Sequence, residues 1–128
     1  MSLREGRGPL FTDHYQLAMA QVHVREGLAD RLAQFDYFYR SNPDYGSHQA
    51  GFCVATGLGP LLEWMQDVHV TDAEVDALSR FTTSTGAPVF EPAFLDWLAE
   101  HGHFRDLVLE AVPEARVVHP HLPIVVVT

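Results

Sequence analysis

Apolar side chains recur at helical spacing along several stretches of this sequence. The first stretch covers about residues 13–26, where apolar residues at positions 15, 18, 19 and 22 fall on one helical face. Gly27 follows at once and predicts the end of that helix, because glycine adopts the left-handed C-terminal cap without strain. Three more helices are predicted, at about residues 58–68, 71–81 and 92–101.

Two of these helices begin with a capping signal. Thr12 and Asp13 are predicted N-caps of the first helix, and Gln16, three residues after Asp13, closes a capping box. Thr71 and Glu74 stand in the same relation further along the chain. We therefore expect one helix to begin beside Asp13 and another beside Thr71.

Alternating and β-branched residues predict strands in the rest of the chain. An aromatic strand is expected at residues 33–40 and a buried strand at residues 50–56, with a turn-rich loop at 42–47 between them. Residues 106–112, 116–119 and 123–128 predict a strand meander with proline at its edges. Helices and strands are largely segregated, which favours an α+β fold with an antiparallel or mixed sheet and about four helices.

The two ends of the chain differ in character. Residues 1–10 are predicted to be a flexible lead-in, which leaves residues 11–128 as one domain. The last predicted strand, at residues 123–128, is apolar and has no turn behind it. Such a strand either lies inside a sheet or exposes an adhesive edge. We therefore expect a partner chain or a further segment to pair with it, and we interpret the domain as truncated at residue 128.

Composition and charge exclude several classes of function. A net charge of −9 argues against nucleic-acid binding, and the apolar runs are too short to span a membrane. All basic residues are arginine, which excludes a Schiff-base lysine and a phosphate-binding P-loop lysine. The single Cys53 excludes an internal disulfide and a zinc site with several cysteines, and we expect a cytoplasmic protein.

Two histidine pairs could suggest a metal site. His101 and His103, like His119 and His121, are two residues apart, so a strand would place each pair on one face. Zinc requires three or four ligands with supporting groups, and no carboxylate at matching spacing accompanies either pair. We interpret them as surface or loop histidines and predict no metal site in this chain.

The start of the first helix carries a more specific signal. Residues 12–19 read Thr-Asp-His-Tyr-Gln-Leu-Ala-Met, which resembles the Thr-Asp-x-Tyr-Gln-x-x-Met signature of nicotinate phosphoribosyltransferases. Further blocks are similar to that family in the same order, at residues 35–43, 51–58, 94–98 and 111–120. The resemblance covers roughly residues 9–128.

The resemblance implies a fold and a division of labour. In this family of type II phosphoribosyltransferases, these blocks form an N-terminal domain of the α/β-hammerhead type, and a catalytic barrel follows. The whole enzyme joins nicotinate to phosphoribosyl diphosphate, giving nicotinate mononucleotide and diphosphate with ATP hydrolysis in NAD biosynthesis. The barrel is absent from this chain, so we expect the chain alone to be inactive and to bind no cofactor. Mg²⁺ and ATP are implied for the full enzyme, with a homodimer or a separate barrel segment as the chain's partner.

The resemblance also implies roles for three residues. Tyr15 would cross a dimer interface and stack on nicotinate bound in the partner subunit's barrel, with Asp13 as a second contact in trans. The residues themselves leave alternatives open, because Tyr15 also fits a tyrosine packed in its own core and Asp13 fits an N-cap. Arg40, after the aromatic strand, is a candidate anion contact or a solvated strand end. No catalytic residue is assigned to this chain.

Two residues depart from the family's pattern. His14 replaces an apolar residue and places a titratable ring beside Tyr15. Ala115 replaces a turn glycine, which weakens the expectation of a left-handed turn there. Two other functions stay open: a non-catalytic dimerisation or binding module derived from the family, and a relative of quinolinate phosphoribosyltransferase. The signature favours nicotinate over quinolinate.

Overall fold

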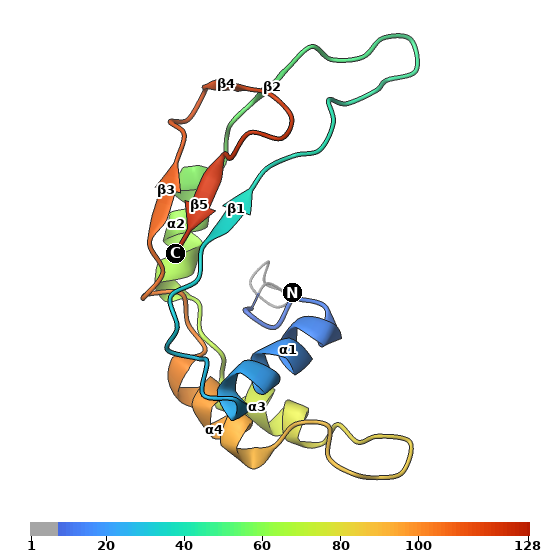
Figure 1. Cartoon of the computed structure of the whole chain (residues 1–128), viewed down its shortest axis with the longest axis vertical. Helices are drawn as coiled ribbons and strands as arrows, with labels where there is room; N and C mark the ends of the chain where they lie inside the picture. Colours follow the sequence, from blue (N-terminus) through green and yellow to red (C-terminus); the bar gives the residue numbers. More distant parts are fainter. Residues whose placement is uncertain (1–7) are drawn as a thin grey trace. The chain divides into compact units, whose positions relative to one another are not determined.

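The computed structural model describes residues 8–128, whose contacts divide the chain into two compact units (Figure 1). The first unit comprises residues 8–31 together with Met65–Arg105, and the second comprises Leu32–Trp64 together with Asp106–Thr128. Residues 1–7 of the predicted lead-in lie outside the described residues. Each unit therefore combines two segments that lie far apart in the sequence.

The first unit is helical and contains the buried core. Its helices are α1 (His14–Arg25), α3 (Asp72–Ser79) and α4 (Pro92–His101), while α2 (Leu58–Asp67) starts in the second unit and ends in the first. The four predicted helices are thus confirmed, with ends that differ by at most two residues. The buried apolar cluster consists of Val70, Leu78, Phe90, Phe94, Leu95 and Leu98.

Helix α1 turns one of two apolar stripes toward the core. Leu17, Ala20 and Val24 pack against the core, whereas Tyr15, Met19 and Val22, from the apolar face noted in the sequence, are exposed by 58%, 54% and 42%. The helix sequence His-Tyr-Gln-Leu-Ala-Met-Ala-Gln-Val-His-Val-Arg carries apolar residues on both stripes. The periodicity of one helix does not decide which of two such stripes a neighbouring element will cover.

One of the two predicted capping boxes forms. The Thr71 side chain accepts a hydrogen bond from the Glu74 backbone N–H, and the Glu74 carboxylate accepts one from the Thr71 backbone N–H. The box predicted for Asp13 and Gln16 is absent, because Asp13 is the N-cap residue of α1 but its side chain makes no cap bond. The Gln16 side chain instead accepts a hydrogen bond from the Thr12 hydroxyl.

Gly27 caps the C-terminal end of helix α1, as predicted. Gly27 has a φ of +66°, and its backbone N–H donates to the carbonyl of Val24 over 3.1 Å. The next residue, Leu28, donates to the carbonyl of His23 over 2.8 Å. These two bonds form a Schellman motif, which satisfies carbonyls that the helix leaves free at its end.

The second unit is built on a three-stranded antiparallel sheet. Its order is β1 (Phe35–Tyr37), β5 (Val125–Val127), β3 (Leu109–Ala111), so the last strand of the chain is central and pairs on both sides within the chain. The expectation that a partner chain or further segment pairs with this strand is therefore wrong. The α+β class is confirmed, since helices and antiparallel strands occupy separate segments.

A second, two-stranded sheet replaces the predicted meander. β2 (Cys53–Val54) pairs with β4 (Val117–Val118), so β3 and β5 are neighbours while β4, between them in the sequence, belongs to another sheet. The buried strand predicted at residues 50–56 is shorter, and Cys53 is only half-buried. Among the described residues of this unit, only Val118 is buried, so the unit contains no buried apolar cluster like that of the first unit.

A left-handed turn connects β3 to β4 despite the alanine. Ala115 has a φ of +63°, and the Arg116 backbone N–H donates to the carbonyl of Pro113 over 3.3 Å. The Ala115 N–H donates in turn to the carbonyl of Ala55 over 2.9 Å, in line with the strand pair of β2 and β4. The paired strands thus hold Ala115 in a conformation that an L-residue adopts at a cost of about 1–2 kcal/mol.

Candidate functional site

The first turn of α1 brings two of the three candidate residues together. Asp13 stands at the N-cap with extended backbone (φ −73°, ψ 141°), and Tyr15 follows within the first helical turn. The Gln16 amide contacts two other residues of this segment. Its Oε1 accepts a hydrogen bond from the Thr12 hydroxyl, and its Nε2 makes a long contact of 3.5 Å with the Tyr15 hydroxyl. The signature residues therefore contact one another as well as shaping the helix start.

Tyr15 lies on the apolar face of α1 that is not covered. Its side chain is more than half exposed, and Met19 and Val22, one and two turns later, are exposed on the same stripe. Phe11, just before the helix, is exposed by 84%. We call Phe11, Tyr15, Met19 and Val22 the α1 apolar face. An exposed ring flanked by apolar side chains suits stacking on a flat aromatic ligand or docking on a second apolar surface.

A different stripe of α1 contacts residues 89–91. The Gln21 amide makes two hydrogen bonds there, donating to the carbonyl of Val89 over 3.1 Å and accepting from the backbone N–H of Glu91 over 2.6 Å. The His14 ring contacts Phe90 with 5.7 Å between ring centroids. Sequence reasoning missed Gln21, since one glutamine in an amphipathic helix carries no signal without its partners.

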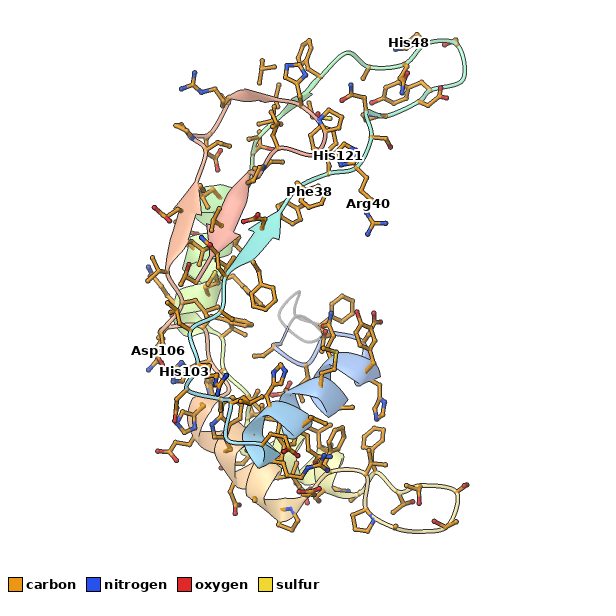
Figure 2. All side chains as sticks on the ribbon, viewed as in Figure 1. Phe38, Arg40, His48, His103, Asp106 and His121 are labelled. Carbon is orange, nitrogen blue, oxygen red and sulfur yellow. The ribbon has the colours of Figure 1, made fainter. Side chains whose placement is uncertain are left out.

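The third candidate, Arg40, belongs to the second unit. It follows the end of β1, is exposed, and its side chain makes no hydrogen bond or ion pair within residues 8–128. Figure 2 shows the Arg40 side chain extending away from the ribbon near Phe38 and His121, whose rings lie 5.8 Å apart. Its guanidinium is thus accessible to an anion.

A hydrogen-bonded tyrosine fixes the backbone around Arg40. The Tyr39 hydroxyl lies 2.8 Å from the carbonyl oxygen of Val118 and 2.9 Å from Asn42 Oδ1. Burial raises the pKa of this hydroxyl, and the nearby Cys53 thiol raises it further. Asn42, predicted to be a turn residue, therefore also takes part in a polar cluster between the two sheets of the second unit.

The histidines serve local contacts. His101 stacks on Trp97 in the last turn of α4 with 5.1 Å between rings, and His103 forms an isolated β-bridge with His69. His121 donates its backbone N–H to the carbonyl of Tyr39 over 2.9 Å. Within residues 8–128, no three side chains of His, Cys, Asp or Glu are grouped as metal ligands would be.

None of the helices in residues 8–128 has the length and apolar character needed to cross a bilayer.

Comparisons with known proteins agree on one family. A family model described as the nicotinate phosphoribosyltransferase (NAPRTase) N-terminal domain matches residues 10–128. The nicotinate phosphoribosyltransferase of Caenorhabditis elegans is 30% identical over 119 residues, covering 93% of this chain and 20% of that protein. The Bos taurus enzyme is 32% identical over 132 residues, covering 97% of this chain and 22% of that protein.

A solved structure supports the same assignment. The crystal structure of human nicotinic acid phosphoribosyltransferase matches with a TM-score of 0.73 and 30% sequence identity. The match covers 91% of this chain and 21% of the human chain. This chain therefore spans about a fifth of the length of the relatives that it matches.

Proposed function

This chain belongs to the nicotinate phosphoribosyltransferase family, as its N-terminal domain, and on that premise we propose that it completes a nicotinate site held by a catalytic barrel. The full enzyme would convert nicotinate and phosphoribosyl diphosphate into nicotinate mononucleotide and diphosphate, coupled to ATP hydrolysis, in the cytoplasm. The barrel would supply the chemistry, and this chain would cover the site across a subunit interface. The chain alone would form no product.

The observation that carries this proposal is the α1 apolar face. The family signature places a tyrosine on α1, and in this chain that tyrosine lies on the stripe turned away from the core. A ring in its own core could not contact a ligand, whereas Tyr15 can. We propose that Tyr15 stacks on the nicotinate ring bound by the partner subunit and that Asp13, beside it, contacts the same substrate.

Arg40 is proposed to contact an anionic group of a substrate. Its guanidinium is exposed and makes no contact with a carboxylate in the described part of the chain, so its charge is available for a phosphate or carboxylate. A planar guanidinium binds such groups through paired N–H donors. Replacing Arg40 by Gln would remove that charge while keeping a polar side chain of similar reach.

The family implies Mg²⁺ bound together with the diphosphate substrate. The described residues of this chain do not fit that ion, because their acidic and histidine side chains form no group of three or more suited to a metal. The part that this chain plays is to place an aromatic ring, a carboxylate and a cation.

The test is the nicotinate dependence of the Tyr15→Ala enzyme, measured in an assembly of this domain with its barrel. Stacking contributes about 0.5–1.5 kcal/mol beyond area burial, so KM for nicotinate should rise about two- to tenfold or more. Tyr45→Ala is the matched control, because Tyr45 is similarly exposed, by 64%, and lies in the second unit. Equal KM values for Tyr15→Ala and wild type would contradict the stacking proposal.

The source of the barrel is a separate question with its own measurement. Reading the gene beyond codon 128 shows whether a barrel is encoded downstream. A stop codon there would favour the alternative of a dimerisation or binding module, unless a separate barrel chain restores product formation. Product formed by the 128-residue chain alone would overturn the proposal that the chemistry lies in the barrel.

A further inference from the structure

Gln21 makes a pair of hydrogen bonds that no other side chain of α1 makes in the described structure. Its Nε2 donates to the Val89 carbonyl over 3.1 Å, and its Oε1 accepts from the Glu91 backbone N–H over 2.6 Å. The side chain thus satisfies a carbonyl and an N–H two residues apart, as a neighbouring strand would. The bond to the Val89 carbonyl is partly buried, where water replaces it poorly, whereas the bond from the Glu91 N–H is exposed.

Two flanking contacts extend this attachment along the helix. The His14 ring meets Phe90 at 5.7 Å, and the Arg25 guanidinium lies 3.6 Å from the Glu91 carboxylate. Successive helical residues are about 100° apart, so positions 14, 21 and 25 fall within roughly 40° of one another. Residues 89–91 therefore follow one stripe of α1 from its first turn to its last.

Apolar packing alone leaves the rotation of α1 poorly determined. The stripe of Leu17, Ala20 and Val24 packs on the core, but the α1 apolar face offers a second stripe of larger side chains. Apolar contacts have no direction, whereas the two Gln21 bonds require one rotation of the helix about its axis. A polar contact of this kind selects one of two otherwise acceptable packings.

We propose that Gln21 is a positioning residue that holds α1 in the rotation that turns Tyr15 away from the core and toward a bound ligand. This inference rests on the proposed role of Tyr15 at nicotinate. Gln21 itself touches no substrate in this proposal and acts through the helix. Loss of its amide would allow α1 to rotate about its axis, so that the α1 apolar face packs on the core in place of Leu17, Ala20 and Val24.

The direct test uses the 128-residue chain in solution and the variant Gln21→Met, which keeps the length of the side chain and removes both hydrogen bonds. Hydrogen exchange of the Glu91 N–H should become about two- to tenfold faster, as the loss of one net hydrogen bond predicts. Residual dipolar couplings of the α1 amides should change relative to those of α3 and α4. Unchanged couplings in α1 would overturn the proposal.

Gln16→Met is the matched control on the same helix. Within residues 8–128, the Gln16 amide hydrogen-bonds to Thr12 and Tyr15 alone and makes no bond to residues 89–91. Its substitution should leave the α1 couplings and the exchange of Glu91 as in wild type. If Gln21→Met fails to fold, Gln21→Glu keeps the acceptor for the Glu91 N–H and removes the donor to Val89, and the couplings of the α1 amides decide.

Kinetic measurements on the assembled enzyme distinguish a failure of this inference from a failure of the proposed function. In the assembled enzyme, Gln21→Met should raise KM for nicotinate about two- to tenfold with little change in kcat, and should add nothing in a Tyr15→Ala background. If Tyr15→Ala raises KM while Gln21→Met does not, the positioning role is wrong. If Tyr15→Ala has no effect, the proposed function fails, and the couplings of α1 still decide whether Gln21 sets its rotation.

Discussion

Gly102 offers a sharp test of the packing in the first unit. The residue follows α4 with a φ of −73°, so the backbone there does not require glycine. A Cβ at this position would lie 2.6 Å from Val70 Cγ2 and 2.8 Å from Val70 Cβ, and would also contact the carbonyl oxygen of Leu98. The need for glycine is therefore steric, and Gly102→Ala is the perturbation.

The expected loss follows from these distances. Carbon atoms pack best at about 3.5–4.0 Å, so the added methyl would overlap Val70 by about 1 Å. Val70 is buried in the core and its backbone N–H donates to the Gly102 carbonyl over 2.7 Å, which prevents an easy retreat. Overpacking of a core costs about 1–3 kcal/mol, and we expect about 3 kcal/mol here because a backbone oxygen is also in the way.

Urea and thermal unfolding of the 128-residue chain measure this loss. A change of about 3 kcal/mol should lower Tm by about 10–15 °C for a domain of this size. Gly59→Ala is the control, because a Cβ at Gly59 in α2 meets no atom within 4 Å, and alanine should stabilise that helix by about 0.5–1 kcal/mol. A double-mutant cycle that combines Gly102→Ala with Val70→Ala should show that the two losses of unfolding free energy do not add. Stability of Gly102→Ala within 0.5 kcal/mol of wild type would refute the packing around Val70.

Three further predictions concern local features. Ala115→Gly should stabilise the chain by about 0.5–1 kcal/mol, since the relief of a left-handed alanine outweighs the entropy of glycine; a lower urea midpoint would contradict this. Thr71→Ala should destabilise it by about 1 kcal/mol through loss of the capping box with Glu74, and Thr71→Ser should restore most of that loss. The raised pKa of the Tyr39 hydroxyl means that its contribution to stability is complete below the ordinary tyrosine pKa of about 10 and is lost as pH rises through the higher folded value. Unfolding midpoints between pH 9 and 11 should therefore fall less steeply for Tyr39→Phe, and identical slopes would be evidence against the assignment.

Local rules predicted the helices well because their signals lie within a few residues. Thr71 and Glu74 form the predicted capping box and Gly27 the predicted left-handed cap, whereas Asp13 and Gln16, at the same spacing, form no box. The rotation of α1 could not be predicted in this way, since it depends on residues 89–91, far along the chain. The predicted strand meander was wrong for the same reason. β5 pairs with β1, which lies far from it in the sequence, and with β3, whereas β4 pairs with β2.

The candidate site was predicted from family resemblance more than from physics. Tyr15 fits a core residue as well as a ligand contact until its exposure is known. Asp13 is at the N-cap position, but its side chain makes no cap bond, so capping does not account for its carboxylate. Ala115 shows the limit of a residue-type rule, because the strand pair around it imposes a backbone conformation that alanine resists.

Because β5 is the central strand of its sheet, the two units cannot form at the same time during synthesis. The core of the first unit is complete once residue 98 has left the ribosome, but the three-stranded sheet needs Val125–Val127 between two strands made earlier. Until then the backbone of β1 has no hydrogen-bonding neighbour, and the rings of Phe35 and Tyr37 on it are exposed, as they also are in the folded chain. A nascent chain arrested between these points would carry a folded helical unit and an unpaired aromatic strand, the kind of segment that chaperones bind and that aggregates.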